Sequence, residues 1–142
     1  MTRIVPRIAL ALAAAALLAA CGASNTRAER DAQRLEDLRS VAGEPVRDFR
    51  YTRLQAWNTY GEESVLVETS LREGWLLTVD APCIDLPFAQ AIGLSSGPGN
   101  TVSTFDYVVI GHDRCRINEI RPVDLRALRA LGIERAESAA GR

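Results

Sequence analysis

The fold of this chain is decided by residues 64–79, which read SVLVETSLREGWLLTV. Apolar and β-branched residues alternate with their neighbours in both halves of this stretch, from Val65 to Thr69 and from Trp75 to Val79. A period of two is typical of a β-strand that is buried on one face. Residues 70–74 form a short connection that ends in Gly74, so the stretch predicts a β-hairpin.

A second hairpin is predicted nearer the C-terminus. Residues 105–110 and 115–120 are rich in aromatic and β-branched side chains, and the Gly-containing turn 111–114 separates them. Ile117 and Ile120 have opposite parity, so they cannot both lie on one face of a regular strand. We therefore expect a bulge or an early strand end near Asn118.

Weaker sequence patterns predict the remaining elements of the domain. Residues 49–59, after Val46, are rich in aromatic and β-branched residues, residues 87–92 predict one or two helical turns ended by Gly93, and residues 95–100 predict a loop. Together these patterns predict an α+β fold. We expect a small, mainly antiparallel β-sheet or partly open barrel of five or six strands, with an N-terminal helix and a short C-terminal helix.

The N-terminal helix is predicted between two boundary signals. Thr26 and Glu29 form a capping-box pattern, and Gly43 followed by Pro45 marks the end of a helix of about fifteen residues. The apolar stripe of this helix is thin. The larger apolar residues of the stripe are Leu35, Leu38 and Val41. The helix therefore either packs lightly on the domain or serves as a stalk.

The C-terminal helix is predicted over residues 124–131 from the spacing of its leucines, with Gly132 closing it. Residues 133–142 are expected to form a flexible tail. The globular, mainly β domain is therefore expected to span residues 46–132.

The N-terminus of the chain has the features of an export signal. Arg3 and Arg7 precede an unbroken apolar run at residues 8–20. Thirteen residues of helix rise only about 20 Å, too short for a hydrocarbon core of about 30 Å. A basic start, a short apolar run and small residues at the end are typical of a secretory signal peptide.

The junction Leu18-Ala19-Ala20-Cys21 resembles a bacterial lipobox. It predicts that residues 1–20 are a lipoprotein signal peptide and that Cys21 is acylated. Residues 21–45 then comprise the lipidated cysteine, a tether and the helix. Two or more acyl chains anchor a protein stably to a membrane. Because Gly22 is not an aspartate, we expect a lipid anchor in the outer membrane, facing the periplasm.

Composition narrows the possible functions. All seventeen basic residues are arginine, and removal of Arg3 and Arg7 leaves fifteen against eighteen acidic residues, a net charge of about −3. Such a mildly acidic chain lacks the excess of basic residues that is expected of a nucleic-acid-binding protein. The single histidine and three cysteines offer little material for a metal site, and no metal or cofactor is predicted.

Once Cys21 is acylated, Cys83 and Cys115 remain. Two cysteines in an exported chain most simply form a disulfide. Two alternatives stay open, a thiol nucleophile or a zinc site that would use His112 and Asp113. A structural zinc ion normally takes four Cys or His ligands, and a nucleophile requires a free thiolate. Both requirements count against these alternatives.

The order of motifs also resembles a known family. Cys83 is followed by a Pro-, Ala- and Ile-containing stretch, a Gly-containing loop, the segment FDYVV (residues 105–109) and the segment CRINEIRPVD (residues 115–124). This order is similar to a family of small proteobacterial secreted or lipidated proteins of the two-cysteine type, classed only as a domain of unknown function. The resemblance covers about residues 49–128. It implies an envelope location and a Cys83–Cys115 pair, and no reaction or catalytic residue.

Two groups of residues are the main candidates for chemistry, since the carboxylate pair Glu62 and Glu63 follows Gly61 at a predicted turn and is better explained as a solvated face. Asp80 and Asp85 flank Cys83, and a pair of carboxylates suits general acid–base catalysis. Arginines near the C-terminus can bind carboxylates or phosphates if they project from one side, or they can form salt bridges within the chain. This possible anion-binding cluster comprises Arg114, Arg116, Arg121, Arg126 and Arg129.

The predicted function is that of a non-catalytic binding or structural module, an envelope lipoprotein attached to the membrane by its N-terminal lipid. Its expected partner is an envelope protein or an anionic cell-wall polymer, and not nucleic acid. The alternative is a small periplasmic hydrolase or metal-binding protein that uses Asp80 and Asp85, or His112.

Overall fold

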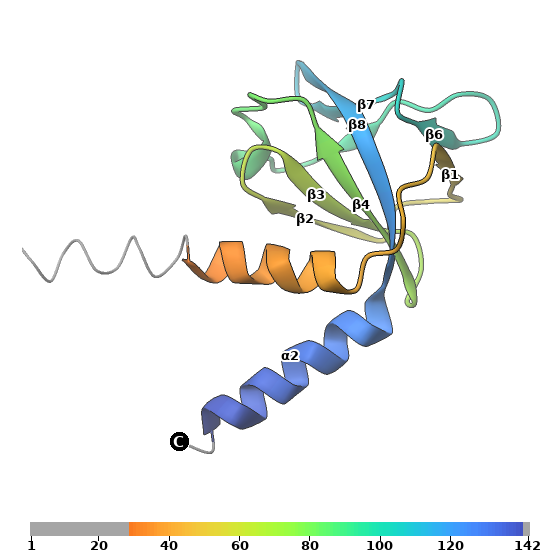
Figure 1. The fold of residues 1–142 in the computed structure, drawn as a ribbon. Coiled ribbons are helices and arrows are strands. Elements are labelled where there is room, and N and C mark those ends of the chain that lie inside the picture. The colour runs from red at the N-terminus through yellow and green to blue at the C-terminus, as the bar shows by residue number, and fades with distance from the viewer. Residues whose placement is uncertain (1–28, 141–142) are drawn as a thin grey trace, which may run out of the picture. The chain divides into compact units, whose positions relative to one another are not determined.

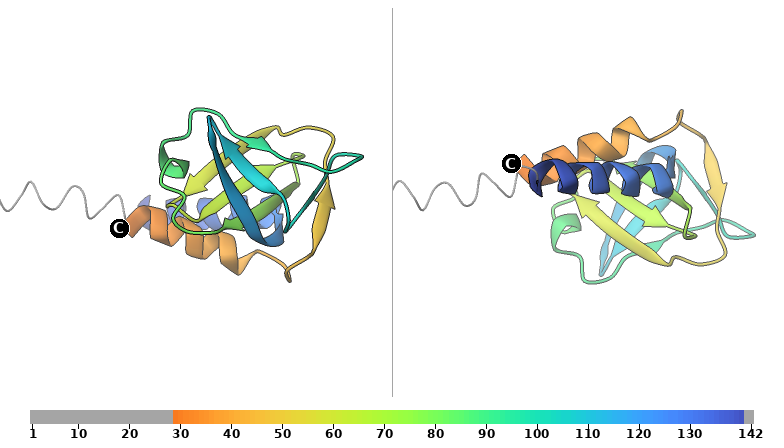
Figure 2. Two further views of the ribbon diagram at one scale, coloured as in Figure 1. Left: turned by 90° about the horizontal axis from the view of Figure 1, so that it is seen from above. Right: turned by 90° about the horizontal axis from the view of Figure 1, so that it is seen from below.

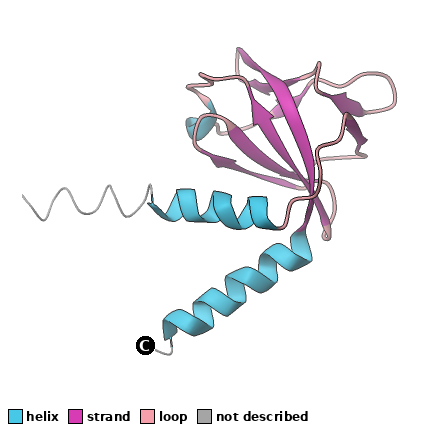
Figure 3. Cartoon of the chain, in the orientation of Figure 1, coloured by secondary structure: helices cyan, strands magenta, loops and turns pink. Residues whose placement is uncertain are grey.

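The computed structural model describes residues 29–140, with side chains described as far as residue 132. The predicted signal peptide, Cys21, Gly22 and Thr26 lie outside the described residues. Residues 34–142 form one compact unit. An antiparallel six-stranded sheet dominates it, with strand order β2-β3-β4-β8-β7-β5, and a separate two-stranded sheet pairs β1 with β6 (Figures 1 and 3).

The hairpin predicted from residues 64–79 is confirmed. β3 (Ser64–Glu68) and β4 (Glu73–Val79) pair in antiparallel fashion, with Val65 opposite Leu77 and Val67 opposite Trp75. Gly74 does not end the loop as expected but lies inside β4. A Cβ atom at this position would lie 3.0 Å from Leu125 Cδ2 and 3.1 Å from Leu66 Cδ1, so glycine is needed for close packing.

The second hairpin and its bulge are also confirmed. β7 (Tyr107–Ile110) and β8 (Asp113–Asp124) are joined by a tight turn in which Gly111 has a φ of 59°. Along the β4–β8 pair, Thr78 is opposite Glu119 and Val79 is opposite Ile117. Asn118 is therefore the extra residue of the bulge, which returns Ile117 and Ile120 to the same face.

β8 continues four residues beyond the predicted end at Ile120. Pro122 lies within it, opposite Trp75 of β4, while the β7 partner ends at Arg116. The carbonyl of Pro122 accepts a hydrogen bond from the backbone N–H of Gly43. Its nitrogen therefore faces the edge away from β4, where the missing N–H breaks no ladder bond.

The remaining elements are short. β1 (Asp48–Arg50) pairs with β6 (Thr101–Ser103), β2 (Ala56–Tyr60) pairs with β3, and β5 (Gly93–Leu94) pairs with β7. The helical turn expected over 87–92 is the 3₁₀ turn η1 (Leu86–Phe88). Gly93 begins a strand and does not cap the turn, because Ala89 already leaves the helical conformation with a ψ of 129°.

The sheet curves into a half-barrel, and each face has its own core (Figure 2). The inner core contains side chains of six strands together with Cys83 and Leu86. Trp57 and Trp75 pack against it, and the Trp75 ring stacks on Phe49 with centroids 4.6 Å apart. The outer core comprises Leu38, Leu66, Leu76, Val123 and Leu125.

The N-terminal helix, described over residues 29–40, contributes Leu38 to this outer core. Leu38 is completely buried. The structure therefore shows that the helix packs on the sheet at Leu38, which is one of the two roles predicted for it.

The C-terminal helix α2 (Leu125–Ala140) begins where it was predicted, but it does not end at Gly132. Gly132 is not among the glycines with a positive φ, and the helix continues through it. A glycine inside a helix costs about 1 kcal/mol relative to alanine, and the alanine, arginine and glutamate residues that follow are good helix formers. The mobility of residues 133–142 stays a prediction.

Candidate anion-binding site

The two cysteines of the domain are joined. A Cys83–Cys115 disulfide links the segment before η1 to β8, with the Cα atoms 5.9 Å apart. This confirms the predicted disulfide and leaves neither sulfur available as a thiolate. In the described part of the chain, no group of three or more His, Cys, Asp or Glu residues is arranged to hold a metal ion.

The structure gives Asp80 and Asp85 different partners. Asp80 accepts a hydrogen bond of 3.0 Å from the side-chain amide of Asn118, at the bulge. Asp85 interacts with Asp113 of β8, and the hydrogen bond and the negative charge of Asp113 raise the pKa of Asp85. His112 lies exposed in the β7–β8 turn beside Asp113, at the rim of a cavity of about 490 Å³ that Asp85 and Phe88 also border.

The Asp85–Asp113 pair gives the domain a predicted pH dependence. Because the pKa of Asp85 is raised above its ordinary value of 3.8, the folded state favours the protonated carboxyl. Protonation of Asp85 therefore stabilises the folded state relative to the unfolded state. This contribution to the free energy of unfolding is complete below about pH 4 and is lost as the pH rises through the higher folded-state pKa. We expect Asp85→Asn to have a higher melting temperature than wild type at pH 7, a difference that fades at acidic pH.

Thermal unfolding followed by circular dichroism between pH 3.5 and 7.5 measures this difference. Glu62→Gln, which removes an exposed carboxylate elsewhere, serves as the control. An Asp85→Asn profile parallel to that of wild type would contradict the prediction.

Three of the five candidate arginines have partners within the chain. Arg114 lies over the Tyr107 ring, 4.6 Å from its centroid. Arg121 Nε donates to Glu119 Oε1 at 2.7 Å, and this bond raises the pKa of Arg121. Arg129 Nη2 donates to the backbone carbonyl of Leu71 at 2.7 Å.

The other two arginines do not lie at one site. Arg116 is opposite Tyr107 near the start of β8, whereas Arg126 lies in the first turn of α2. Arg116 and Asp124 are eight positions apart in this strand, which corresponds to about 26 Å at 3.3 Å per residue. The predicted cluster is therefore spread along β8 and into α2.

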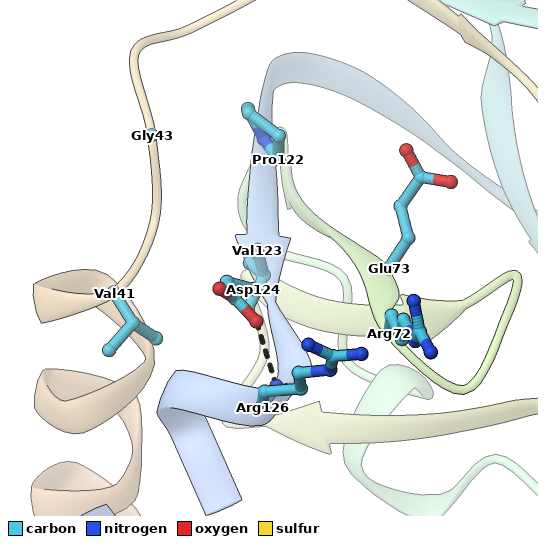
Figure 4. A pocket seen from close by; sticks show the side chains of 8 residues that line it. All are labelled: Val41, Gly43, Arg72, Glu73, Pro122, Val123, Asp124 and Arg126. Atoms are coloured by element: carbon cyan, nitrogen blue, oxygen red, sulfur yellow. Dashed lines mark hydrogen bonds between the residues drawn. The ribbon is translucent and has the colours of Figure 1, made fainter. Parts of the chain in front are cut away.

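Arg126 instead lies close to a residue that sequence reasoning missed. Arg72, in the β3–β4 turn, and Arg126 line one hollow of about 460 Å³. Figure 4 shows the side chain of Arg126 extending toward Arg72, while the side chain of Glu73 points away from both. No local pattern could have found this pair, because the two arginines are more than fifty residues apart in the sequence.

Backbone hydrogen bonds hold the turn against the helix. The N–H of Leu125 donates to the Arg72 carbonyl at 3.1 Å, next to the bond between Arg129 and Leu71. Asp124 Oδ1 accepts the N–H groups of Arg126 and Ala127 at 2.8 and 3.3 Å, so this carboxylate is occupied as the helix N-cap (Figure 4). Both guanidinium groups are thus carried on fixed backbone.

Within residues 29–132, neither Arg72 nor Arg126 forms an ion pair or a side-chain hydrogen bond. A guanidinium presents planar N–H donors that match carboxylate and phosphate oxygens. Two such groups facing one hollow make a suitable site for an anion.

The fold and the site define a small, disulfide-bonded α+β half-barrel with an arginine-lined hollow. Neither helix in the described part of the chain is both long and apolar enough to cross a membrane. The chain belongs to a family of unknown function, DUF6491, whose model matches residues 4–139. This match is longer than the expected residues 49–128 and confirms a domain of unknown function. No curated protein and no solved structure matches the chain.

Proposed function

We propose that this protein is a non-catalytic lipoprotein of the bacterial envelope that binds phosphate or carboxylate groups of an envelope component through Arg72 and Arg126. The observation that carries this proposal is the hollow lined by both guanidinium groups, neither of which forms an ion pair with a described residue. Such a site binds its anion with charge-assisted hydrogen bonds.

The envelope location is supported by the leader and its junction. A basic start, a short apolar run and Cys21 at residues 18–21 are typical of a lipoprotein precursor. The family match begins at residue 4 and so includes this segment. We place the protein in the outer membrane, facing the periplasm, and assign its family to the proteobacterial, two-cysteine type.

The first prediction of the proposed function concerns this anchor. Mass spectrometry of the membrane fraction is expected to find an acylated N-terminal peptide that begins at Cys21. Replacing Cys21 by serine removes the thiol to which the lipid is attached. The protein should then lose its membrane association, because stable anchoring requires two or more acyl chains. Recovery of unmodified, soluble mature protein from wild-type cells would contradict lipidation.

The absence of catalysis is the other half of the proposal. Asp80 and Asp85 have separate partners, Asn118 and Asp113, and the two thiols are joined. These arrangements favour a binding module over the alternative of a small hydrolase or metal-binding protein that uses Asp80 and Asp85, or His112.

The binding site gives a second prediction. In the mature chain with Cys21→Ser, titration with inorganic phosphate is expected to shift the NMR signals of Arg72 and Arg126. Replacing either arginine by glutamine should weaken binding by roughly tenfold, since a hydrogen bond to a charged group contributes about 1.5 to 3 kcal/mol.

Arg116→Gln is the matched control, because Arg116 is exposed and lies near the other end of β8. It should leave the affinity for phosphate unchanged. Equal weakening by Arg116→Gln and Arg72→Gln would mean that phosphate binds by general charge, and the proposed site would be wrong.

A further inference from the structure

The turn that carries Arg72 also carries a large apolar side chain that the fold leaves in solvent. Leu71 is 75% exposed, next to Arg72 in the sequence and hydrogen-bonded through its carbonyl to Arg129. Exposed leucines are common on protein surfaces, but this one lies in the turn that carries Arg72 and is held by Arg129. We define the basic tip as Leu71, Arg72, Arg126 and Arg129.

We propose that the basic tip docks on the surface of an anionic lipid bilayer, with Leu71 entering the interface and the arginines binding lipid phosphates. This inference rests on the proposed function and names the anion as a phosphate of a lipid headgroup. Apolar side chains with arginines around them are typical of segments that lie in a membrane interface. The long aliphatic part of arginine also lets its charge stay at the headgroup level.

Charge complementarity selects the basic tip over the other exposed apolar residues. Phe88 is 76% exposed, but it borders the cavity that also contains the Asp85 and Asp113 carboxylates. Phe105 is 79% exposed, and its neighbours in the sequence are Thr104 and Asp106, with no arginine beside it. An anionic bilayer repels such carboxylates and attracts arginines.

Two acidic residues, Glu73 and Asp124, border the basic tip, and among the described residues neither forms an ion pair with its arginines. Glu73 points away from Arg72 and Arg126 in Figure 4, and Asp124 Oδ1 accepts the backbone N–H groups of α2. Three arginines against two carboxylates leave this surface with a net positive charge.

The turn holds Leu71 in position. Ser70 Oγ accepts the N–H groups of Arg72 and Glu73 at 3.2 and 3.0 Å, and Leu125 and Arg129 bind the carbonyls of Arg72 and Leu71. A preorganised turn loses little conformational entropy on binding, so it suits docking without a change of fold.

Vesicle flotation tests this proposal. The mature chain with Cys21→Ser, which contains every described residue, is mixed with vesicles of phosphatidylcholine alone or of phosphatidylcholine and phosphatidylglycerol in equal parts. Binding is expected only to the anionic vesicles. Leu71→Ser should weaken it roughly tenfold by removing the apolar contact, and Arg72→Gln should weaken it about fivefold.

Phe105→Ser and Arg116→Gln are the matched controls, one for exposed apolar area and one for charge, and both should bind like the parent chain. Unchanged melting temperatures show that each variant is folded.

Weaker vesicle binding by Leu71→Ser with unchanged phosphate titration supports docking. Equal vesicle binding by Leu71→Ser and the parent chain, or equal binding to both kinds of vesicle, overturns docking and leaves the phosphate site intact. A parent chain whose Arg72 and Arg126 signals do not respond to phosphate overturns the proposed function instead.

Discussion

Replacing Cys83 and Cys115 together by alanine is expected to lower the free energy of unfolding by about 2 to 5 kcal/mol, the usual cost of losing a native disulfide in a small secreted domain. The two cysteines are 32 residues apart, so the bond closes a loop of moderate length and restricts the unfolded chain. In the folded chain it attaches the segment around η1 to β8. That segment contributes the buried residues Cys83 and Leu86 to the inner core.

Urea unfolding of the mature Cys21→Ser chain measures this effect cleanly, because Cys83 and Cys115 are then its only cysteines. The wild-type pair in the presence of reductant should unfold like the double alanine variant. If two free thiols titrate in the native protein, or if reductant leaves the urea midpoint unchanged, the predicted contribution of the bond is wrong.

Much of the sheet could be predicted because its signals are local. The alternation in residues 64–79 places Val65, Val67, Leu77 and Val79 in the inner core, while Leu66 and Leu76 between them face the outer core. The parity change between Ile117 and Ile120 predicted the bulge at Asn118, because both side chains have to reach that core. The disulfide also followed from the number of cysteines in a chain predicted to be exported.

The features that could not be predicted from the sequence depend on contacts between distant parts of the chain. Gly74 looked like a turn residue, but Leu125 of α2 and Leu66 approach it so closely that a Cβ atom there would force them to shift. The same approach of α2 to the β3–β4 turn brings Arg126 to Arg72, so the candidate site is a product of tertiary packing. The cluster predicted from sequence proximity was spread out instead, because an extended strand separates neighbouring residues by about 3.3 Å each.

The helix that precedes the domain provides the last prediction. Replacing Leu38 by alanine is expected to destabilise the domain by about 2 to 5 kcal/mol, the range for truncating a leucine in a well-packed core. Leu38 is 0% exposed and packs with Leu66 and Leu76 on the outer face of the sheet. Urea unfolding followed by circular dichroism gives the change in the free energy of unfolding.

Glu36→Ala is the matched control, since Glu36 is exposed on the same helix and alanine is a better helix former than glutamate. It should leave the stability within about 0.5 kcal/mol of wild type, as surface substitutions usually do. The comparison separates packing from helix formation: a helix that acts only as a stalk would tolerate both changes equally. A Leu38→Ala midpoint that coincides with that of Glu36→Ala would therefore show that the outer core does not depend on this helix. A large loss confined to Leu38→Ala would show that the segment after the predicted tether is part of the folded domain.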